Sequence, residues 1–192
     1  MMLSRIRSGR ELKVAVVLTV IGIAAGLNIC LAGDEVSKAS GGPVPGLKAL
    51  DAEGRMHISQ QDRCPVCAMM PAKHAKFASA IQLKSGETYY FCGTGCMIRT
   101  WMHPEVFLNV PADKLERCVV PAYFSGEQID GLSAFWVAGS DVVGPMGPAL
   151  VPLKTADGVD AFRERHGGSV VFKMGELDDQ RWEEITGKKA VP

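Results

Sequence analysis

Cysteine spacing is the feature that most constrains this 192-residue chain, because four of its six cysteines form two close pairs. Two residues separate Cys64 from Cys67, with Pro65 making a turn between them, and three residues separate Cys92 from Cys96. Cysteine pairs at such spacings are typical of metal sites in which thiolates are the ligands. The sequence therefore predicts a soft-metal site built from these two pairs.

The residues between the pairs predict how the pairs meet. Phe77–Lys84 and Glu87–Phe91 are rich in strand-forming residues and flank Ser85-Gly86, a two-residue hairpin signal. A helix over Gly95–His103 then begins at the second pair and stops before Pro104, since a residue that precedes proline disfavours helical backbone. A cysteine turn, a hairpin and a second pair at a helix start make a treble-clef-like arrangement, in which the folded hairpin brings the pairs together.

The rest of the chain alternates short strands and helices, which indicates an α+β fold with small antiparallel sheets. Pro152 suggests that the strand around it lies at a sheet edge, and Gly167-Gly168 closes the helix before them. We predict one metal-binding domain over residues 47–192, in two lobes at roughly 60–125 and 126–186. The predicted strands are Cys118–Phe124, Ala134–Val137, Ala149–Leu153 and Ser169–Lys173, the helices Thr155–His166 and Glu176–Ile185, and Gly46–Ile58 is an initial strand or loop.

The N-terminal segment has a different composition. Arg and Lys residues up to Lys13 precede Val14–Ala32, which carries no charge and is close to the length of about 20 residues that a membrane-spanning helix needs. The basic flank is expected to stay in the cytoplasm. Residues 1–33 are thus predicted to anchor the chain in the inner membrane and 34–46 to form a flexible tether, with the domain on the periplasmic or extracytoplasmic side. A cleaved signal, or a lipid on Cys30, remains an alternative that exports the domain equally.

Charge argues against nucleic acid as a partner. Lys plus Arg and Asp plus Glu both number 21, so the formal net charge is zero. Proteins that bind nucleic acids carry a basic patch or stripe, and the aromatic residues here are not interleaved with basic ones.

Disulfide chemistry is an alternative for the cysteines, because exported proteins meet oxidising conditions. Cys64 and Cys67 could form a redox-active pair, and Cys92 and Cys96 a structural bridge. A redox CxxC motif usually begins a helix, which lowers the thiol pKa. Pro65 and the Met70-Pro71 step argue against a helix at the first pair. Metal binding is therefore the favoured reading of that pair.

Methionines near the thiols bear on which metal binds. Four thiolates alone would suit a closed zinc site, but the chain has nine methionines, and thioethers are soft ligands suited to Cu(I). Met69, two residues after Cys67, is a ligand candidate, whereas Met97 and Met102 on the helix are expected to fill the core. Cu(I) is the preferred ion, with structural zinc as an alternative at Cys92 and Cys96.

The histidines give weaker signals. His74 is either a further ligand or gate, or a surface residue, and His103 is expected to end the helix. His57 and His166 are predicted to lie at the surface. Cys118 is predicted to be a buried free thiol in an apolar strand. No cysteine has a neighbouring base that would activate it as a nucleophile, so the protein is not expected to be an enzyme.

These motifs resemble the NosL-type copper chaperones, accessory proteins of nitrous oxide reductase. The specific elements are Cys64-Pro-Val-Cys-Ala-Met69 and Gly144-Pro145-Met146-Gly147, within a resemblance that covers roughly Arg63–Lys173. Supporting matches are His74, Ala80-Ile81-Gln82, Tyr90-Phe91, Cys96-Met97, Trp101, Ala134-Phe135-Trp136-Val137, Ala161-Phe162 and Gly167-Gly168.

The resemblance implies a membrane-anchored, outward-facing protein of two small αβ lobes that binds Cu(I). Its partners would be a recipient cuproenzyme under assembly, such as nitrous oxide reductase, and a copper-supplying or membrane transporter complex. Carried over by position, the ligand candidates are Cys64, Cys67, Met69, His74 and Met146. Two or three soft ligands from the set Cys64, Cys67, Met69 and Met146 would form a shallow site from which copper leaves by ligand exchange.

One stretch departs from the family pattern. Phe91-Cys92-Gly-Thr-Gly-Cys96, followed by His103-Pro104, looks like the small YHS/TRASH-type metal-sensing domains. The additional thiolates favour a closed four-cysteine site. Cys92 and Cys96 are therefore predicted either to bind the transported ion or to hold a structural one.

Overall fold

The computed structural model describes residues 42–192. The predicted membrane anchor, residues 1–33, and most of the predicted tether, 34–46, lie outside the described residues. Within 42–192, no helix combines the length and apolar character required to cross a membrane.

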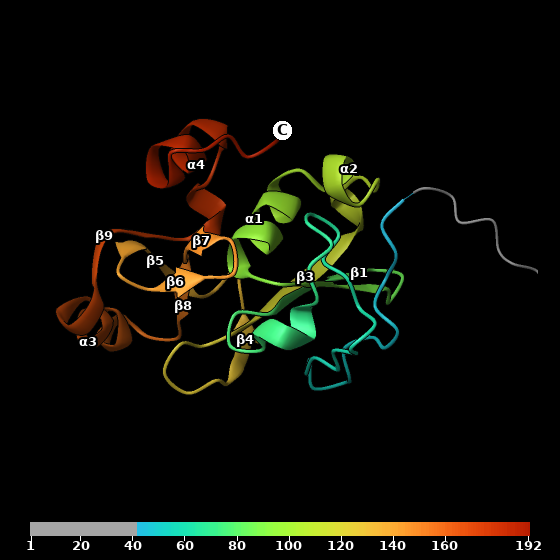
Figure 1. Ribbon diagram of the computed structural model, residues 1–192, viewed down its shortest axis with the longest axis horizontal. Helices are drawn as coiled ribbons and strands as arrows, with labels where there is room; N and C mark the ends of the chain where they lie inside the picture. Colours follow the sequence, from blue (N-terminus) through green and yellow to red (C-terminus); the bar gives the residue numbers. More distant parts are fainter. Residues whose placement is uncertain (1–41) are drawn as a thin grey trace, which may run out of the picture. The chain divides into compact units, whose positions relative to one another are not determined.

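The first sheet has four antiparallel strands in the order β2-β1-β3-β4 (Figure 1). They are β1 (Ser79–Leu83), β2 (Thr88–Phe91), β3 (Leu115–Pro121) and β4 (Gln128–Asp130). The predicted hairpin at Ser85-Gly86 is confirmed: Ala80 pairs with Tyr90, and Gly86 takes a φ of +93°, which a glycine adopts without strain. The hairpin thus places the end of β2, and with it Cys92, beside the start of β1.

Two helices follow β2 and pack on one face of this sheet. Helix α1 (Thr94–Met102) buries Met97 and Ile98 in the same core as Ile81 and Phe91. His103 is its C-cap, as predicted, and Pro104 opens the short helix α2 (Pro104–Phe107). Helix α1 is therefore fixed over the sheet with its N-terminal turn beside the second cysteine pair.

The other face of the sheet is covered by the segment before the first cysteine pair. Leu50 packs there against Ala80, Tyr90 and Val119. The predicted initial strand or loop at 46–58 is irregular, since residues 46–58 form no helix or strand. This segment leads directly into the cysteine turn.

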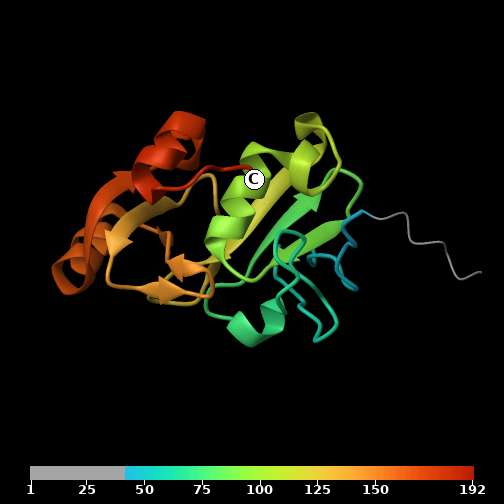
Figure 2. The same ribbon diagram turned by 45° about the horizontal axis from the view of Figure 1, so that its top comes forward.

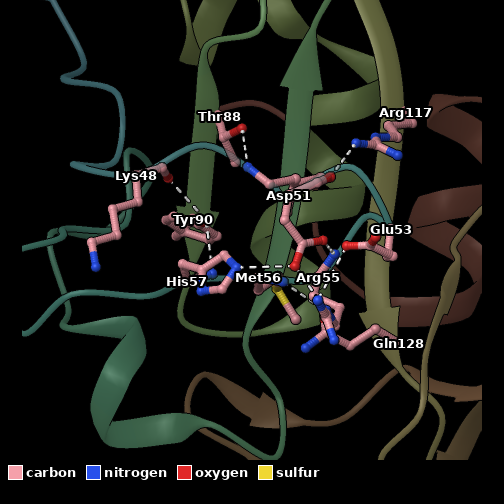
Figure 3. A network of polar contacts seen from close by, with 11 residues as sticks. Lys48, Asp51, Glu53, Arg55, Met56, His57, Thr88, Tyr90, Arg117 and Gln128 are labelled. Atoms are coloured by element: carbon pink, nitrogen blue, oxygen red, sulfur yellow. Dashed lines mark hydrogen bonds and ion pairs between the residues drawn. The ribbon is translucent and has the colours of Figure 1, made fainter.

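Polar contacts hold that covering segment together (Figure 3). The Asp51 carboxylate accepts hydrogen bonds from the Arg55 backbone N–H and Nε, both at 2.7 Å, and lies 3.2 Å from His57 Nε2. The Tyr90 hydroxyl accepts from the His57 backbone N–H at 3.1 Å and donates to the Lys48 carbonyl at 3.0 Å. His57 is at the surface, as predicted, and is part of this network.

The second sheet has three antiparallel strands in the order β8-β5-β9. They are β5 (Phe135–Ser140), β8 (Val151–Leu153) and β9 (Gly167–Phe172). Helix α3 (Ala156–His166) lies between β8 and β9 in the chain, and helix α4 (Asp179–Thr186) follows β9. Strand β8 lies at the edge, as Pro152 predicts. The N-cap of α3 is Thr155, whose hydroxyl accepts from the Gly158 N–H.

A small hairpin, β6 (Val143–Gly144) and β7 (Gly147–Pro148), carries Pro145 and Met146 in its turn. Gly147 has a φ of +106°, which explains a glycine at the exit of the turn. Short 3-10 helices complete the structure at Pro71–His74, Ala112–Lys114 and Met174–Glu176.

One apolar core joins residues of both sheets. It includes Ile81 and Phe91 from the first sheet, and Trp136 and Phe172 from the second. The α+β fold with small antiparallel sheets is confirmed, and the predicted lobe boundaries stay a prediction.

Candidate metal centre

The first cysteine pair lies on a tight turn with its own backbone hydrogen bonds. The Cys64 N–H donates to the Met69 carbonyl at 2.9 Å, and the Ala68 N–H donates to the Cys64 carbonyl at 2.8 Å. To close the turn, Ala68 takes a φ of +58°, a conformation that is unfavourable for a residue with a Cβ. Backbone geometry therefore fixes the relative position of Cys64 and Cys67.

The second pair is placed by the junction of a strand and a helix. Cys92 follows β2 directly, and Cys96 lies in the first turn of α1, whose N-cap is Gly93. The exposed fractions of Cys92 and Cys96 are 0% and 3%, and that of Cys64 is 2%, whereas Cys67 is partly exposed. Cys67 is thus the most exposed residue of the four.

All four Sγ atoms lie within 4.8 Å of one another. The Cys67 and Cys92 sulfurs are 3.4 Å apart, and those of Cys92 and Cys96 are 4.0 Å apart. Four thiolates around a tetrahedral ion at a metal–sulfur distance of about 2.3 Å would be about 3.8 Å apart. The donor set, which we call the four-thiol cluster, therefore fits a soft ion, Zn²⁺ or Cu(I).

The sulfurs also shift one another's protonation. Hydrogen bonds from the Cys92 and Cys96 thiols, helped by the backbone N–H groups of Cys92 and Val66, lower the pKa of Cys64. The pKa values of Cys92 and Cys96 are raised, first by their hydrogen bonds to Cys64. Raised pKa values keep thiols protonated, so an ion that binds all four sulfurs must release protons.

The other predicted ligands lie on separate segments of the chain. The Met69 carbonyl closes the cysteine turn, and its side chain is partly buried against the core. Met146 is 49% exposed on the β6–β7 turn. His74 lies in the 3-10 helix after the turn, and its ring is not one of the groups gathered with the four sulfurs. Ligation by Met69, Met146 and His74 stays a prediction, whereas Met97 fills the core as predicted.

A cavity connects the cluster to the turn that carries Met146. It has a volume of about 330 Å³, and Cys96 and Met146 both line it. The two elements are close: a Cβ placed on Gly93 would lie 3.5 Å from Pro145 Cδ. Both ribbon views show the β6–β7 hairpin beside α1 (Figures 1 and 2). Met146 and Cys96 therefore border the same cavity, and Met146 is the more exposed of the two.

Sequence reasoning missed the contribution of α4 to this cavity. Trp182, Ile185 and Thr186 line it opposite Cys96. This helix was predicted only as a polar terminal helix, although the apolar side chains of Trp182 and Ile185, three positions apart, indicate one buried face.

The remaining sequence predictions have clear outcomes. Cys118 is fully buried and free, as predicted, and burial raises its pKa to about 12. His166 is not a simple surface residue, because its Nδ1 is 2.9 Å from Asp141 and its Nε2 3.2 Å from the Tyr123 hydroxyl. These partners come from distant parts of the chain, which the local sequence could not reveal.

Comparison with known proteins agrees with this fold. A curated relative, the copper-binding lipoprotein NosL of Stutzerimonas stutzeri, is 29% identical over 120 residues, which are 61% of this chain and 62% of the relative. The chain thus matches less than two thirds of that protein's length. The crystal structure of the copper chaperone NosL from Shewanella denitrificans superposes with a TM-score of 0.55 at 19% identity, over 66% of this chain and 96% of that one. The NosL family model matches residues 55–182, and the chain belongs to the NosL family.

Proposed function

We propose that this protein is a metallochaperone for Cu(I), which the four-thiol cluster binds and releases through the cavity beside it. One observation carries the proposal: Cys96 belongs to the cluster and also lines the cavity that Met146 borders. A soft ion held by Cys96 therefore has a second soft ligand on its way to solvent.

Ligand exchange is the mechanism that this arrangement favours. The buried sulfurs of Cys64, Cys92 and Cys96 hold the ion away from water, whereas the Met146 thioether is exposed. Cu(I) binds thiolates and thioethers and tolerates low coordination numbers. Copper passes from Cys96 to Met146, and from there to a soft ligand of the partner, with Met69 as a further stabilising thioether. No covalent bond within the protein changes.

Family membership supports the proposed partners. The recipient is a cuproenzyme under assembly, of the nitrous oxide reductase class, and a copper-supplying or transporter complex loads the chaperone. The lipoprotein name of the Stutzerimonas relative supports membrane attachment on the extracytoplasmic side, which a lipid on Cys30 or the N-terminal segment would provide.

The cluster also favours a second function, that of a structural zinc site. Four sulfurs within 4.8 Å, three of them buried, resemble the closed sites that hold Zn²⁺ permanently. In that case the ion stabilises an interaction domain and is not transferred.

Competition between the ions separates these functions. The reduced full-length chain, loaded with one equivalent of Zn²⁺, is titrated anaerobically with Cu(I) in the presence of a chromophoric Cu(I) chelator. For a chaperone, Cu(I) displaces zinc, and Cys96→Ser lowers the Cu(I) affinity at least tenfold. Zinc that resists Cu(I), with unfolding when zinc is chelated, would establish the structural site instead.

Met146→Leu tests the exit route. The substitution conserves volume but removes the soft ligand, so the equilibrium affinity for Cu(I) should stay within a few-fold of the original while transfer to the chelator slows. Met56→Leu is the matched control, because Met56 packs on the far face of the first sheet. Equal transfer rates for the two variants would exclude Met146 from the route.

A further inference from the structure

The cavity beside the four-thiol cluster has an electrostatic character that copper binding does not require. Its lining includes two cationic residues, Arg99 and Lys188, and no carboxylate. Among the described residues, neither cation takes part in an ion pair. Helix α1 also begins at this cavity without a side-chain cap, so its positive end adds to the field. The cavity is therefore suited to an anion.

Trp182 gives an independent sign of a missing partner. Its side chain is only 4% exposed, it lines the cavity, and its Nε1 has no hydrogen-bond acceptor within residues 42–192. The fully buried Trp136, by contrast, donates from Nε1 to the Gly131 carbonyl at 2.9 Å. A buried N–H without an acceptor costs free energy, and a ligand oxygen that displaces the neighbours of the indole in the cavity wall would recover it.

The remaining walls are mostly apolar, and they are held in place. Phe77, Leu150 and Ile185 line the cavity between the charged groups. The start of α4 is tied to the end of α1 by His103 Nε2, which is 2.6 Å from Asp179. A second tie joins the Arg99 side chain to the Ala190 carbonyl. The volume of the cavity, about 330 Å³, is at the lower end of the range for ligand pockets and is enough for a few side chains.

We propose that this cavity binds an acidic side chain of the copper partner, on a peptide segment that also carries a methionine or cysteine. The carboxylate accepts from Trp182 Nε1 and faces Lys188 and Arg99, which brings the neighbouring soft ligand to Met146 and Cys96. The proposal rests on the proposed function for the identity of the partner. Charge complementarity selects an acidic segment over a neutral or basic one.

The test uses the indole N–H signals of the full-length, reduced chain without added copper. The chain has three tryptophans, and Trp182→Phe assigns the signal of interest. The probe is the acetylated and amidated peptide Gly-Met-Glu-Met-Gly, with Gly-Met-Gln-Met-Gly as its neutral counterpart. We expect the acidic peptide to shift the Trp182 signal saturably and to bind at least fivefold more tightly than the neutral one, while the Trp136 signal stays in place.

Charge variants keep the proposal falsifiable if Trp182→Phe does not fold. Lys188→Gln should weaken the acidic peptide about two- to fivefold, the range for an exposed ion pair, and leave the neutral peptide unchanged. Lys189→Gln, at the next position and outside the cavity lining, should change neither. Equal binding of both peptides, or no shift of the Trp182 signal, overturns the proposal. Because no copper is added, that failure is distinct from a failure of Cu(I) binding in the titration above.

Discussion

The Cys67 and Cys92 sulfurs lie 3.4 Å apart, although 25 positions separate the two residues in the chain. This contact joins the cysteine turn to the end of β2, and so completes the four-thiol cluster. Each pair alone offers two soft ligands, and only the fold of the hairpin between them produces four. Loss of Cys92 should therefore affect the whole site.

Cys92→Ser should lower the affinity for Cu(I) and Zn²⁺ at least tenfold, because a hydroxyl is a poor ligand for a soft ion. Competition with a chromophoric chelator measures the change. Cys118→Ala is the control, since Cys118 is buried in β3 outside the cluster. Unchanged affinity in Cys92→Ser would mean that Cys92 is not a ligand.

Ala68→Gly should stabilise the protein. The φ of +58° at Ala68 costs about 1–2 kcal/mol for a residue with a Cβ, and glycine avoids this strain. The greater conformational freedom of glycine in the unfolded chain offsets about 0.5–1 kcal/mol of that gain. A gain of about 0.5–1 kcal/mol in the free energy of unfolding is expected, measured by denaturant titration. Ala161→Gly, inside α3, should instead lose about 1 kcal/mol.

Gly131→Ala should destabilise the core next to Cys118. A Cβ at this position would lie 2.8 Å from the Cys118 Sγ, so the strand or the side chain must shift. Overpacking of this kind costs about 1–3 kcal/mol. Gly175→Ala is the control, because a Cβ there meets nothing within 4 Å. The double variant Gly131→Ala with Cys118→Ala should lose less stability than the two single losses combined, and additivity would contradict the proposed clash.

Asp51 should make stability depend on acid pH. Hydrogen bonds from the Arg55 backbone N–H, then from the Arg55 side chain and His57, lower the pKa of Asp51 in the folded protein. A lowered folded pKa gives stabilisation that is complete above the unfolded pKa, about 3.9, and that is lost as the pH falls below it. The difference in unfolding midpoint between the original chain and Asp51→Asn should therefore shrink between pH 5 and pH 2.

The control for this prediction is Asp113→Asn. Asp113 is exposed, and its one ion pair among the described residues is with Lys114, at 3.4 Å. The unfolding midpoint of the Asp113→Asn variant should follow that of the original chain at every pH. If the difference in unfolding midpoint from the original chain depended on pH equally in both variants, Asp51 would not be the cause.

Local signals explain which parts of the fold could be predicted. Ser85-Gly86 determines the first hairpin, His103-Pro104 the end of α1, and Pro152 the edge position of β8. The α+β class and the meeting of the two cysteine pairs followed from such signals. In each case the determining residues are neighbours in sequence.

Elements that depend on distant partners were missed or misplaced. Strand β3 begins at Leu115 rather than at the predicted Cys118, because Leu115 and Arg117 pair with Leu83 and Gln82 of β1. The register shifts between these two pairs, and the polar Glu116 lies at the shift. The three-residue β4 has no apolar pattern of its own and exists through its pairing with β3. Likewise, only tertiary packing brings Trp182 to the cavity beside Cys96.

The order of the cluster and the hairpin along the chain has a consequence for biogenesis. All four cluster cysteines, together with β1 and β2, precede the middle of α1, so they emerge early during synthesis and export. The hairpin that carries Met146 and the helix that carries Trp182 emerge later. If the protein acts as proposed, the nascent chain would acquire its metal ligands before the elements of the exit route, and only the complete chain could transfer copper.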